Sequence, residues 1–160
     1  MFSVRIEESP IDPVALQSAL ARDPQCTGAV ATFTGHMRGA GLSAMALEHY
    51  PGMSEASIEA SLAEAARRWP LQAAALVHRV GELYPGDPIV WVGVACAHRA
   101  AAFRACEFIV DELKVSAPLW KRERDRAGRW RWVDARSGDR ERTRRWQAPA
   151  PAAAPGGPSQ

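Results

Sequence analysis

Two lysines near the end of an apolar-patterned segment are the residues best suited to chemistry. Lys114 closes the run DELK, and Lys121 follows the rigid stretch APLW seven positions later. A lysine among other cations has a lowered pKa, because a neighbouring positive charge disfavours its protonation. Part of it is then a neutral amine that can act as a nucleophile or general base near pH 7. The pattern predicts a catalytic pair of Lys114 and Lys121, with Glu123 placed to orient one of the two amines.

The same lysines also have a plainer interpretation. Lysine is favoured at the C-terminal end of any helix, because the helix macrodipole places partial negative charge there. The spacing alone does not distinguish a catalytic pair from two surface lysines at a helix end.

Three other basic residues fall where predicted elements end. Arg38 lies in a glycine-containing loop after an apolar strand, and His98 with Arg99 lies between the most apolar strand and a predicted helix. Such loops often hold ligand sites, and a helix N-terminus offers free N–H groups and a positive dipole end. Arginine adds a planar fork that matches phosphate oxygens. These residues predict a pocket for an anion, with phosphate as the natural ligand; ordinary surface charge is the alternative.

The other histidines and the cysteines do not indicate a metal site or a disulfide framework. His49 and His78 lie in strand patterns and are interpreted as structural residues with satisfied hydrogen bonds. No HxH or HExxH spacing occurs, so no metal site is predicted. The cysteines Cys26, Cys96 and Cys106 are odd in number and lack a CxxC pair, which predicts neither a disulfide framework nor a zinc site. Cys96 and Cys106 are expected to be small core residues.

The elements that must position these residues follow from apolar patterning and from proline and glycine breaks. Strands are predicted over residues 3–7, 28–35, 43–50, 71–80, 89–97 and 130–133. Helices are predicted between Asp12 and Pro24, over 54–69, and after Arg99 as far as Pro118, which cannot continue a helix. Strands and helices alternate without a strict β-α-β rhythm, so the sequence predicts an α+β domain.

The composition fits one globular domain with a hydrophobic core. The 160 residues are 47% hydrophobic and 24% charged, and a net charge of +2 requires neither nucleic acid nor a membrane as partner. No apolar run reaches the roughly 20 residues that span a bilayer, and the N-terminal segment lacks the apolar core of a signal peptide, so a cytoplasmic protein is expected. Near Gln147 the composition changes to APAPAAAPGGPSQ. This change predicts a domain over residues 1–146 and a disordered Pro/Ala-rich tail over 147–160.

A nucleic-acid-binding module is the competing function class. The segment from Arg122 to Trp146 is rich in arginine and tryptophan, which offer cations and stacking surfaces to single strands. Acidic residues are interspersed in the same segment, and the small net charge also speaks against this class.

Five segments together resemble one known family. They are FTGHMR (33–38), LEHYPGMSE (47–55), VHRVGEL (77–83), AHRAAAFRACEFIVDELK (97–114) and APLWKRE (117–123). From about Val4 to Trp146, the chain is similar to the large, catalytic subunit of molybdopterin synthase in both order and spacing. The combination of HR, DxLK and APxWKxE is highly specific, whereas no single piece is.

The resemblance implies an α/β hammerhead-type fold with a mixed sheet and three main helices. It implies a homodimer in which each copy binds one small, ubiquitin-like sulfur-carrier subunit, giving a heterotetramer. The carrier's C-terminal thiocarboxylate would supply two sulfurs to cyclic pyranopterin monophosphate, which forms the dithiolene of molybdopterin and opens the cyclic phosphate. No cofactor or metal is implied. A scaffold that binds such a carrier without chemistry is a third hypothesis.

The resemblance also assigns roles to residues, position by position. It makes Lys114 the central catalytic lysine and Lys121 the second lysine of the site. Phe33 matches a residue near the carrier tail. The residues that it places at the pterin substrate and its phosphate are these two lysines together with His36, Met37, Arg38, His98, Arg99, Arg122, Glu123 and Arg136.

Overall fold

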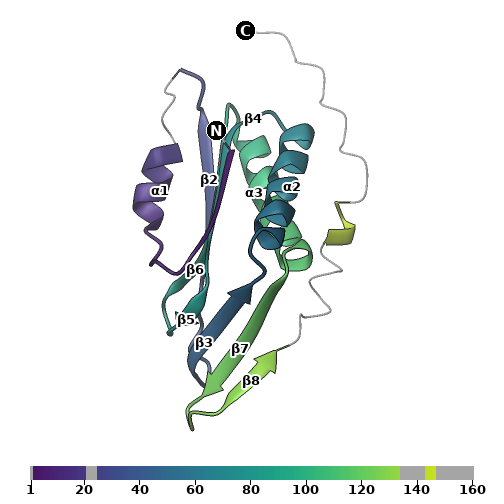
Figure 1. The fold of residues 1–160 in the computed structure, drawn as a ribbon. Helices are drawn as coiled ribbons and strands as arrows, with labels where there is room; N and C mark the ends of the chain where they lie inside the picture. Colours follow the sequence, from purple (N-terminus) through teal and green to yellow (C-terminus); the bar gives the residue numbers. More distant parts are fainter. Residues whose placement is uncertain (1, 21–24, 134–142, 147–160) are drawn as a thin grey trace.

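A computed structural model describes residues 2–20, 25–133 and 143–146 of the chain (Figure 1). The elements in chain order are β1 (Phe2–Glu7), α1 (Pro13–Leu20), β2 (Ala29–His36), β3 (Leu42–His49), α2 (Met53–Arg68), β4 (Leu71–Arg79), β5 (Gly81–Leu83), β6 (Pro88–Cys96), α3 (Arg99–Ser116), β7 (Leu119–Asp125) and β8 (Trp130–Val133). The strands form two four-stranded sheets with the orders β1-β4-β6-β2 and β5-β3-β7-β8. The first sheet is mixed, because β1 runs parallel to β4 while the other pairs are antiparallel.

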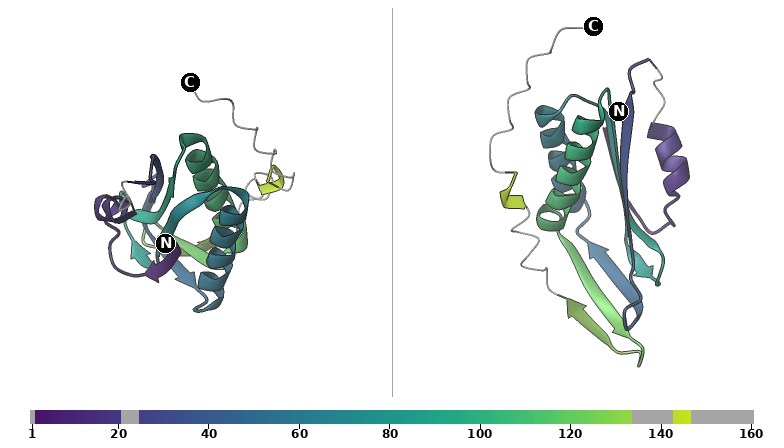
Figure 2. Two further views of the ribbon diagram at one scale, coloured as in Figure 1. Left: turned by 90° about the horizontal axis from the view of Figure 1, so that it is seen from above. Right: turned by 180° about the vertical axis from the view of Figure 1, so that it is seen from behind.

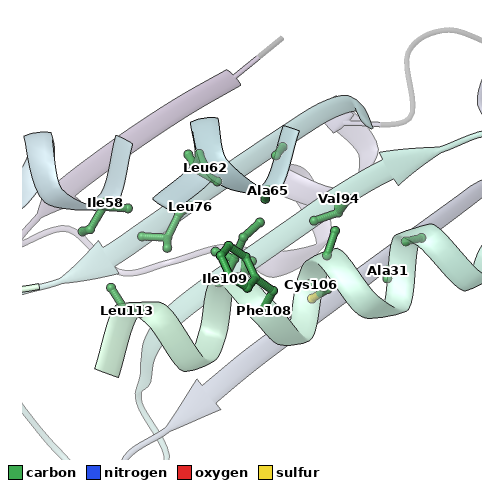
Figure 3. Packing of buried hydrophobic residues seen from close by; sticks show 14 of the residues in the cluster. Ala31, Ile58, Leu62, Ala65, Leu76, Val94, Cys106, Phe108, Ile109 and Leu113 are labelled. Atoms are coloured by element: carbon green, nitrogen blue, oxygen red, sulfur yellow. The ribbon is translucent and has the colours of Figure 1, made fainter. Parts of the chain in front are cut away.

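The first sheet carries helices on both faces, as Figures 1 and 2 show. Successive side chains of a strand point to opposite faces. Accordingly, Ala74 and Leu76 of β4 pack with α2 and α3, whereas Ala75 and Val77 pack in the cluster that contains Leu20 of α1. Figure 3 shows the larger cluster, in which side chains from α2, α3 and the sheet interlock. This packing fixes both ends of α3 relative to the sheet.

The second sheet extends beyond the helices and has two different faces. Met45 and Leu47 of β3 pack with Leu83 of β5 in a third buried cluster, which defines the inner face. Residues directly opposite each other in an antiparallel pair share a face. Lys121 pairs with Leu47 and Glu123 pairs with Met45, so both charged side chains of β7 lie on this inner face.

Residues 143–146 return to the outer side of α2 and α3. The Trp146 ring meets Phe108 of α3 and Trp69 edge-on, with centroid distances of 5.5 and 5.9 Å. The Trp146 indole N–H donates to the buried Asp111 carboxylate at 2.8 Å, and Arg145 pairs with the same carboxylate. We call residues 143–146 the C-terminal clasp, because they join the two helices through one aromatic cluster.

The predicted α+β class with three helices is confirmed, and most strands lie close to their predicted positions. No strand was predicted between Pro118 and Trp130, whereas β7 begins at Leu119. The run LWKRERD carries charge on both faces and therefore lacks the apolar alternation that indicates a strand. Cys96 and Cys106 are buried, as expected, and burial raises the pKa of the Cys106 thiol to about 11. The predicted tail over 147–160 lies outside the described residues.

In the portion of the chain that the structure describes, every helix is too short or too polar to cross a membrane.

Candidate functional site

Lys114 lies in the last turn of α3, on the exposed side of the helix. The turn that follows is held by α2. Ser54 Oγ donates to the Pro118 carbonyl at 3.0 Å, and Ser57 Oγ donates to the Ser116 carbonyl at 2.8 Å. The chain therefore leaves α3 in a fixed direction and enters β7 with Lys114 and Lys121 on either side of this turn.

Glu123 organises the charges on the inner face of β7. Its carboxylate lies 3.0 Å from Lys121 Nζ and 3.3 Å from Arg131 Nη2. Burial alone would raise the pKa of Glu123, but the hydrogen bond and charge of Lys121 and the charge of Arg131 outweigh it and lower the pKa overall. Glu123 is therefore ionised at neutral pH and forms an ion pair with Lys121.

Arg122 lies on the opposite face of the same strand. Its guanidinium stacks over the rings of Trp130 and Trp132, at 4.9 and 5.9 Å, and its Nε lies 3.9 Å from a Glu48 oxygen. Trp120 shares this outer face and, like Trp132, is largely exposed. The WKRE motif is therefore divided between two faces, and Arg122 is separated by the strand from Lys121 and Glu123 within one chain.

The end of β2 carries four predicted residues in different environments. Phe33 is 38% exposed, and His36 and Arg38 are also exposed. Met37 is buried instead, beside Met45, and its N–H and C=O both bond to the turn at 86–87. Because its side chain is in the core, Met37 can fix the backbone between His36 and Arg38 but does not present its thioether to a ligand.

A groove of about 590 Å³ runs between β2 and α3 beside Phe33. Its lining residues are Ala31, Thr32, Phe33, Phe103, Cys106, Glu107, Val110, Asp111 and Arg145. Sequence reasoning did not predict the α3 wall of this groove. The available signal was Phe103, which is 67% exposed, because an apolar ring on the polar side of a helix can mark a binding surface.

The α3 wall of this groove lies on the helix face that also carries Lys114. Phe103, Glu107, Val110 and Lys114 follow one another at spacings of four, three and four residues. Residues at these spacings lie on one face of an α-helix. An extended chain in the groove could therefore follow this face of α3 from Phe103 to Lys114.

His98 and Arg99 lie at the other end of α3. The helix spans 18 residues, and at a rise of about 1.5 Å per residue Lys114 lies roughly 22 Å along the axis from Arg99. Arg38 belongs to the Lys114 end, because His36 pairs with the start of β6 while the end of β6 leads to His98 (Figure 1). One chain therefore does not bring all five predicted cations into one cavity. Arg136 lies outside the described residues.

Among residues 2–20, 25–133 and 143–146, no three His, Cys, Asp or Glu side chains gather in a way that could hold a metal ion.

Comparison with known proteins identifies the family. The model of the MoaE protein family matches residues 6–116. A molybdopterin synthase catalytic subunit from Yersinia pestis is 53% identical over 123 residues, which cover 74% of this chain and 81% of that protein. The catalytic subunit from Pseudomonas aeruginosa is 44% identical over 150 residues, covering 91% of this chain and 99% of that protein.

Solved structures agree. The molybdopterin biosynthesis MoaE protein from Burkholderia ambifaria superposes with a TM-score of 0.81 at 48% identity, covering 92% of this chain and 99% of that chain. A complex of subunits 1 and 2 of molybdopterin-converting factor from Helicobacter pylori shares the fold, with a TM-score of 0.72 at 18% identity over 84% of this chain and 92% of that chain. The chain thus belongs to the MoaE family, the catalytic subunits of molybdopterin synthase, which act in molybdenum cofactor biosynthesis.

Proposed function

We propose that this chain transfers sulfur from the C-terminal thiocarboxylate of a small ubiquitin-like carrier subunit to cyclic pyranopterin monophosphate, forming the molybdopterin dithiolene. One observation carries the proposal: the groove between β2 and α3 is lined as far as Val110 and Asp111, and the same helix face continues for one more turn to Lys114. A carrier tail that enters beside Phe33 would bring its terminal thiocarboxylate to the lysines. The relatives' description as catalytic subunits supports a second, separate subunit.

The lysines would act at the reacting carbon. Release of sulfur from the carrier passes through a tetrahedral oxyanion at the thioacyl carbon, and a fixed ammonium group beside it stabilises that developing charge. Lys114 is the candidate for this role and for proton transfer to or from the reacting atoms. Lys121 is the second lysine, and its ion pair with Glu123 limits where its amine can lie.

The pterin phosphate would bind the predicted basic residues. Arg38 and His36 lie near the end of α3 that carries Lys114, and the buried Met37 fixes the backbone between them. His98 and Arg99 lie too far away to reach the same ligand within one copy. In a homodimer, a second copy could place its α3 N-terminus at this site. The exposed outer face of the second sheet, with Trp120 and Trp132, supports such a contact, because large exposed aromatic side chains mark interaction surfaces.

The residues proposed to bind the pterin substrate also include Arg122 and Arg136. Arg122 lies on the outer face, where it would contribute across the homodimer. The proposed catalytic domain comprises residues 1–146, and the proposed compartment is the cytoplasm, where the heterotetramer with two carriers would form.

Turnover of defined substrates tests this function. The protein is incubated with thiocarboxylated carrier and cyclic pyranopterin monophosphate, and molybdopterin is measured. We expect the native protein to form molybdopterin and the Lys114→Ala variant to lose at least 100-fold in rate. A native rate in Lys114→Ala would show that the role of Lys114 is wrong. Absence of turnover by the native protein, with a carrier complex that forms equally well when both lysines are alanine, would favour a scaffold.

A further inference from the structure

The segment LEHYPGMSE (47–55) is one of the five that resemble the family, yet none of its residues is assigned to the site. Its last residues begin α2, beside the turn that joins α3 to β7 (Figure 1). Ser54, in the first turn of α2, is completely buried. A buried hydroxyl needs hydrogen-bond partners, and the partners of Ser54 indicate what this segment does.

The Ser54 hydroxyl joins two turns that are far apart in the sequence. Its Oγ accepts a hydrogen bond from the Tyr50 N–H at 3.1 Å and donates one to the Pro118 carbonyl at 3.0 Å. The Ser54 N–H also donates to the Tyr50 carbonyl at 2.9 Å. Tyr50 follows the end of β3, and Pro118 precedes the start of β7. One hydroxyl, acting as both donor and acceptor, therefore connects the end of β3 to the start of β7.

The turn after α3 depends on α2 for its position. The helix-type bond made by the Ala117 N–H is 3.4 Å long, beyond the ordinary range of about 2.7–3.2 Å. Proline has no N–H, so Pro118 can join the hydrogen bonding only through its carbonyl oxygen. The last carbonyls of a helix, such as that of Ser116, lack partners within the helix. Two hydroxyls of α2 supply the missing donors, that of Ser57 to Ser116 at 2.8 Å and that of Ser54 to Pro118.

The position of this turn determines where the two lysines lie relative to each other. Lys114 lies in the last turn of α3, and Lys121 is the third residue after Pro118. The core fixes α3, and the far end of β7 is held separately, because Ser43 Oγ donates to the Asp125 carbonyl at 2.8 Å. A displacement of the turn therefore changes the separation of the two amines directly.

We propose that Ser54 is a positioning residue of the transfer site, whose hydroxyl sets the separation of the Lys114 and Lys121 amines by holding the Pro118 carbonyl against α2; this inference rests on the function proposed above. Ser54 acts through the lysines and does not touch substrate, because it is fully buried. Catalytic groups must be held within about 0.5 Å of the productive geometry. Loss of this bond should therefore lower kcat, whereas the groove between β2 and α3, which the turn does not line, should still bind the carrier.

Three substitutions isolate the hydroxyl. Ser54→Ala removes it, Ser54→Thr keeps it, and Ser54→Val matches threonine in shape but lacks it. In the molybdopterin assay we expect Ser54→Ala and Ser54→Val to lower kcat about tenfold with carrier affinity within twofold of native. Ser54→Thr should keep kcat within threefold of the native value. Circular dichroism identifies the variants that fold, and a native kcat in either folded variant without the hydroxyl would overturn the proposal.

Amide hydrogen exchange adds a local measurement with a matched control. Ser54→Ala should speed exchange at the start of β7, over residues 119–121, because the turn before it is released. Ser43→Ala removes the same kind of bond at the other end of the strand, so it should speed exchange only near Asp125 and keep kcat within twofold of native. A tenfold loss of kcat in Ser43→Ala as well would overturn the proposal, because kcat would then follow the stability of β7 in general.

The outcome also separates this inference from the proposed function. If the native protein forms no molybdopterin, the proposed function fails. If the native protein is active and Ser54→Ala is equally active, only the role of Ser54 fails.

Discussion

Glu123 Oε1 lies 3.0 Å from Lys121 Nζ on the face of β7 that packs toward the core. The carboxylate is shared with Arg131, so it joins two cations from neighbouring strands. Its side chain is 13% exposed, and an ion pair that is partly shielded from solvent restrains a lysine more than a surface pair does. Lys121 is therefore held by a neighbouring carboxylate rather than free in solvent.

The first prediction concerns this restraint. Glu123→Gln keeps the shape of the side chain but removes its charge, so Lys121 should become mobile. We expect kcat to fall about tenfold while carrier affinity stays native. Glu48→Gln is the control, because Glu48 lies on the outer face near Arg122 and should have little effect on kcat. If both variants showed native kcat in the molybdopterin assay, Glu123 would have no orienting role.

The second prediction concerns the groove between β2 and α3. Phe33→Ala removes an exposed ring from its wall, and the carrier should bind at least tenfold more weakly because apolar contact area is lost. Phe2→Ala provides a matched comparison, since Phe2 is a similarly exposed ring on β1, the other edge of the same sheet. Titration calorimetry with the carrier should distinguish the two. Equal weakening by both substitutions would place the carrier elsewhere.

The third prediction concerns His78 of β4, because burial lowers the pKa of this residue to about 4. The unfolded chain binds a proton at His78 below its ordinary pKa near 6.5, whereas the folded protein does so only near pH 4. Stability from this residue is therefore fully present above pH 6.5 and is lost as the pH falls to about 4. The loss amounts to roughly 3 kcal/mol over this window.

Urea unfolding at pH 7 and pH 4.5 measures this loss. The His78→Gln variant should show a smaller decrease in the free energy of unfolding than the native protein, because glutamine does not titrate. Carboxylates with lowered pKa, such as Glu123, are present in both proteins and cancel in the comparison. Identical decreases would contradict a neutral, buried His78.

The fourth prediction concerns the C-terminal clasp. Trp146→Ala removes two aromatic contacts and the N–H bond to Asp111, so the free energy of unfolding should decrease by about 3 kcal/mol. A chain that ends at Trp146 should keep native stability, whereas a chain that ends at Arg142 should lose as much as Trp146→Ala does. Thermal unfolding compares the three proteins. A large loss on removing only residues 147–160 would contradict a domain that ends at Trp146.

Local sequence patterns were enough to predict most of the fold. Strands 71–80 and 89–97 are apolar runs of β-forming length, and α3 shows apolar residues at helical spacing that end at Pro118. These signals depend only on neighbours along the chain, so they are visible without a structure. β7 was missed because its two faces both carry charge, and its pairing with β3 depends on a segment at least 70 residues away.

The sequence by itself determined which residues belong to the candidate site, through motifs whose combination is specific to one family. Only the tertiary structure decided how they are distributed. The pairing of β7 with β3 places Lys121 and Arg122 on opposite faces, and the length of α3 separates Arg99 from Lys114. Side-chain proximity arises from contacts between distant segments, which spacing along a chain does not contain.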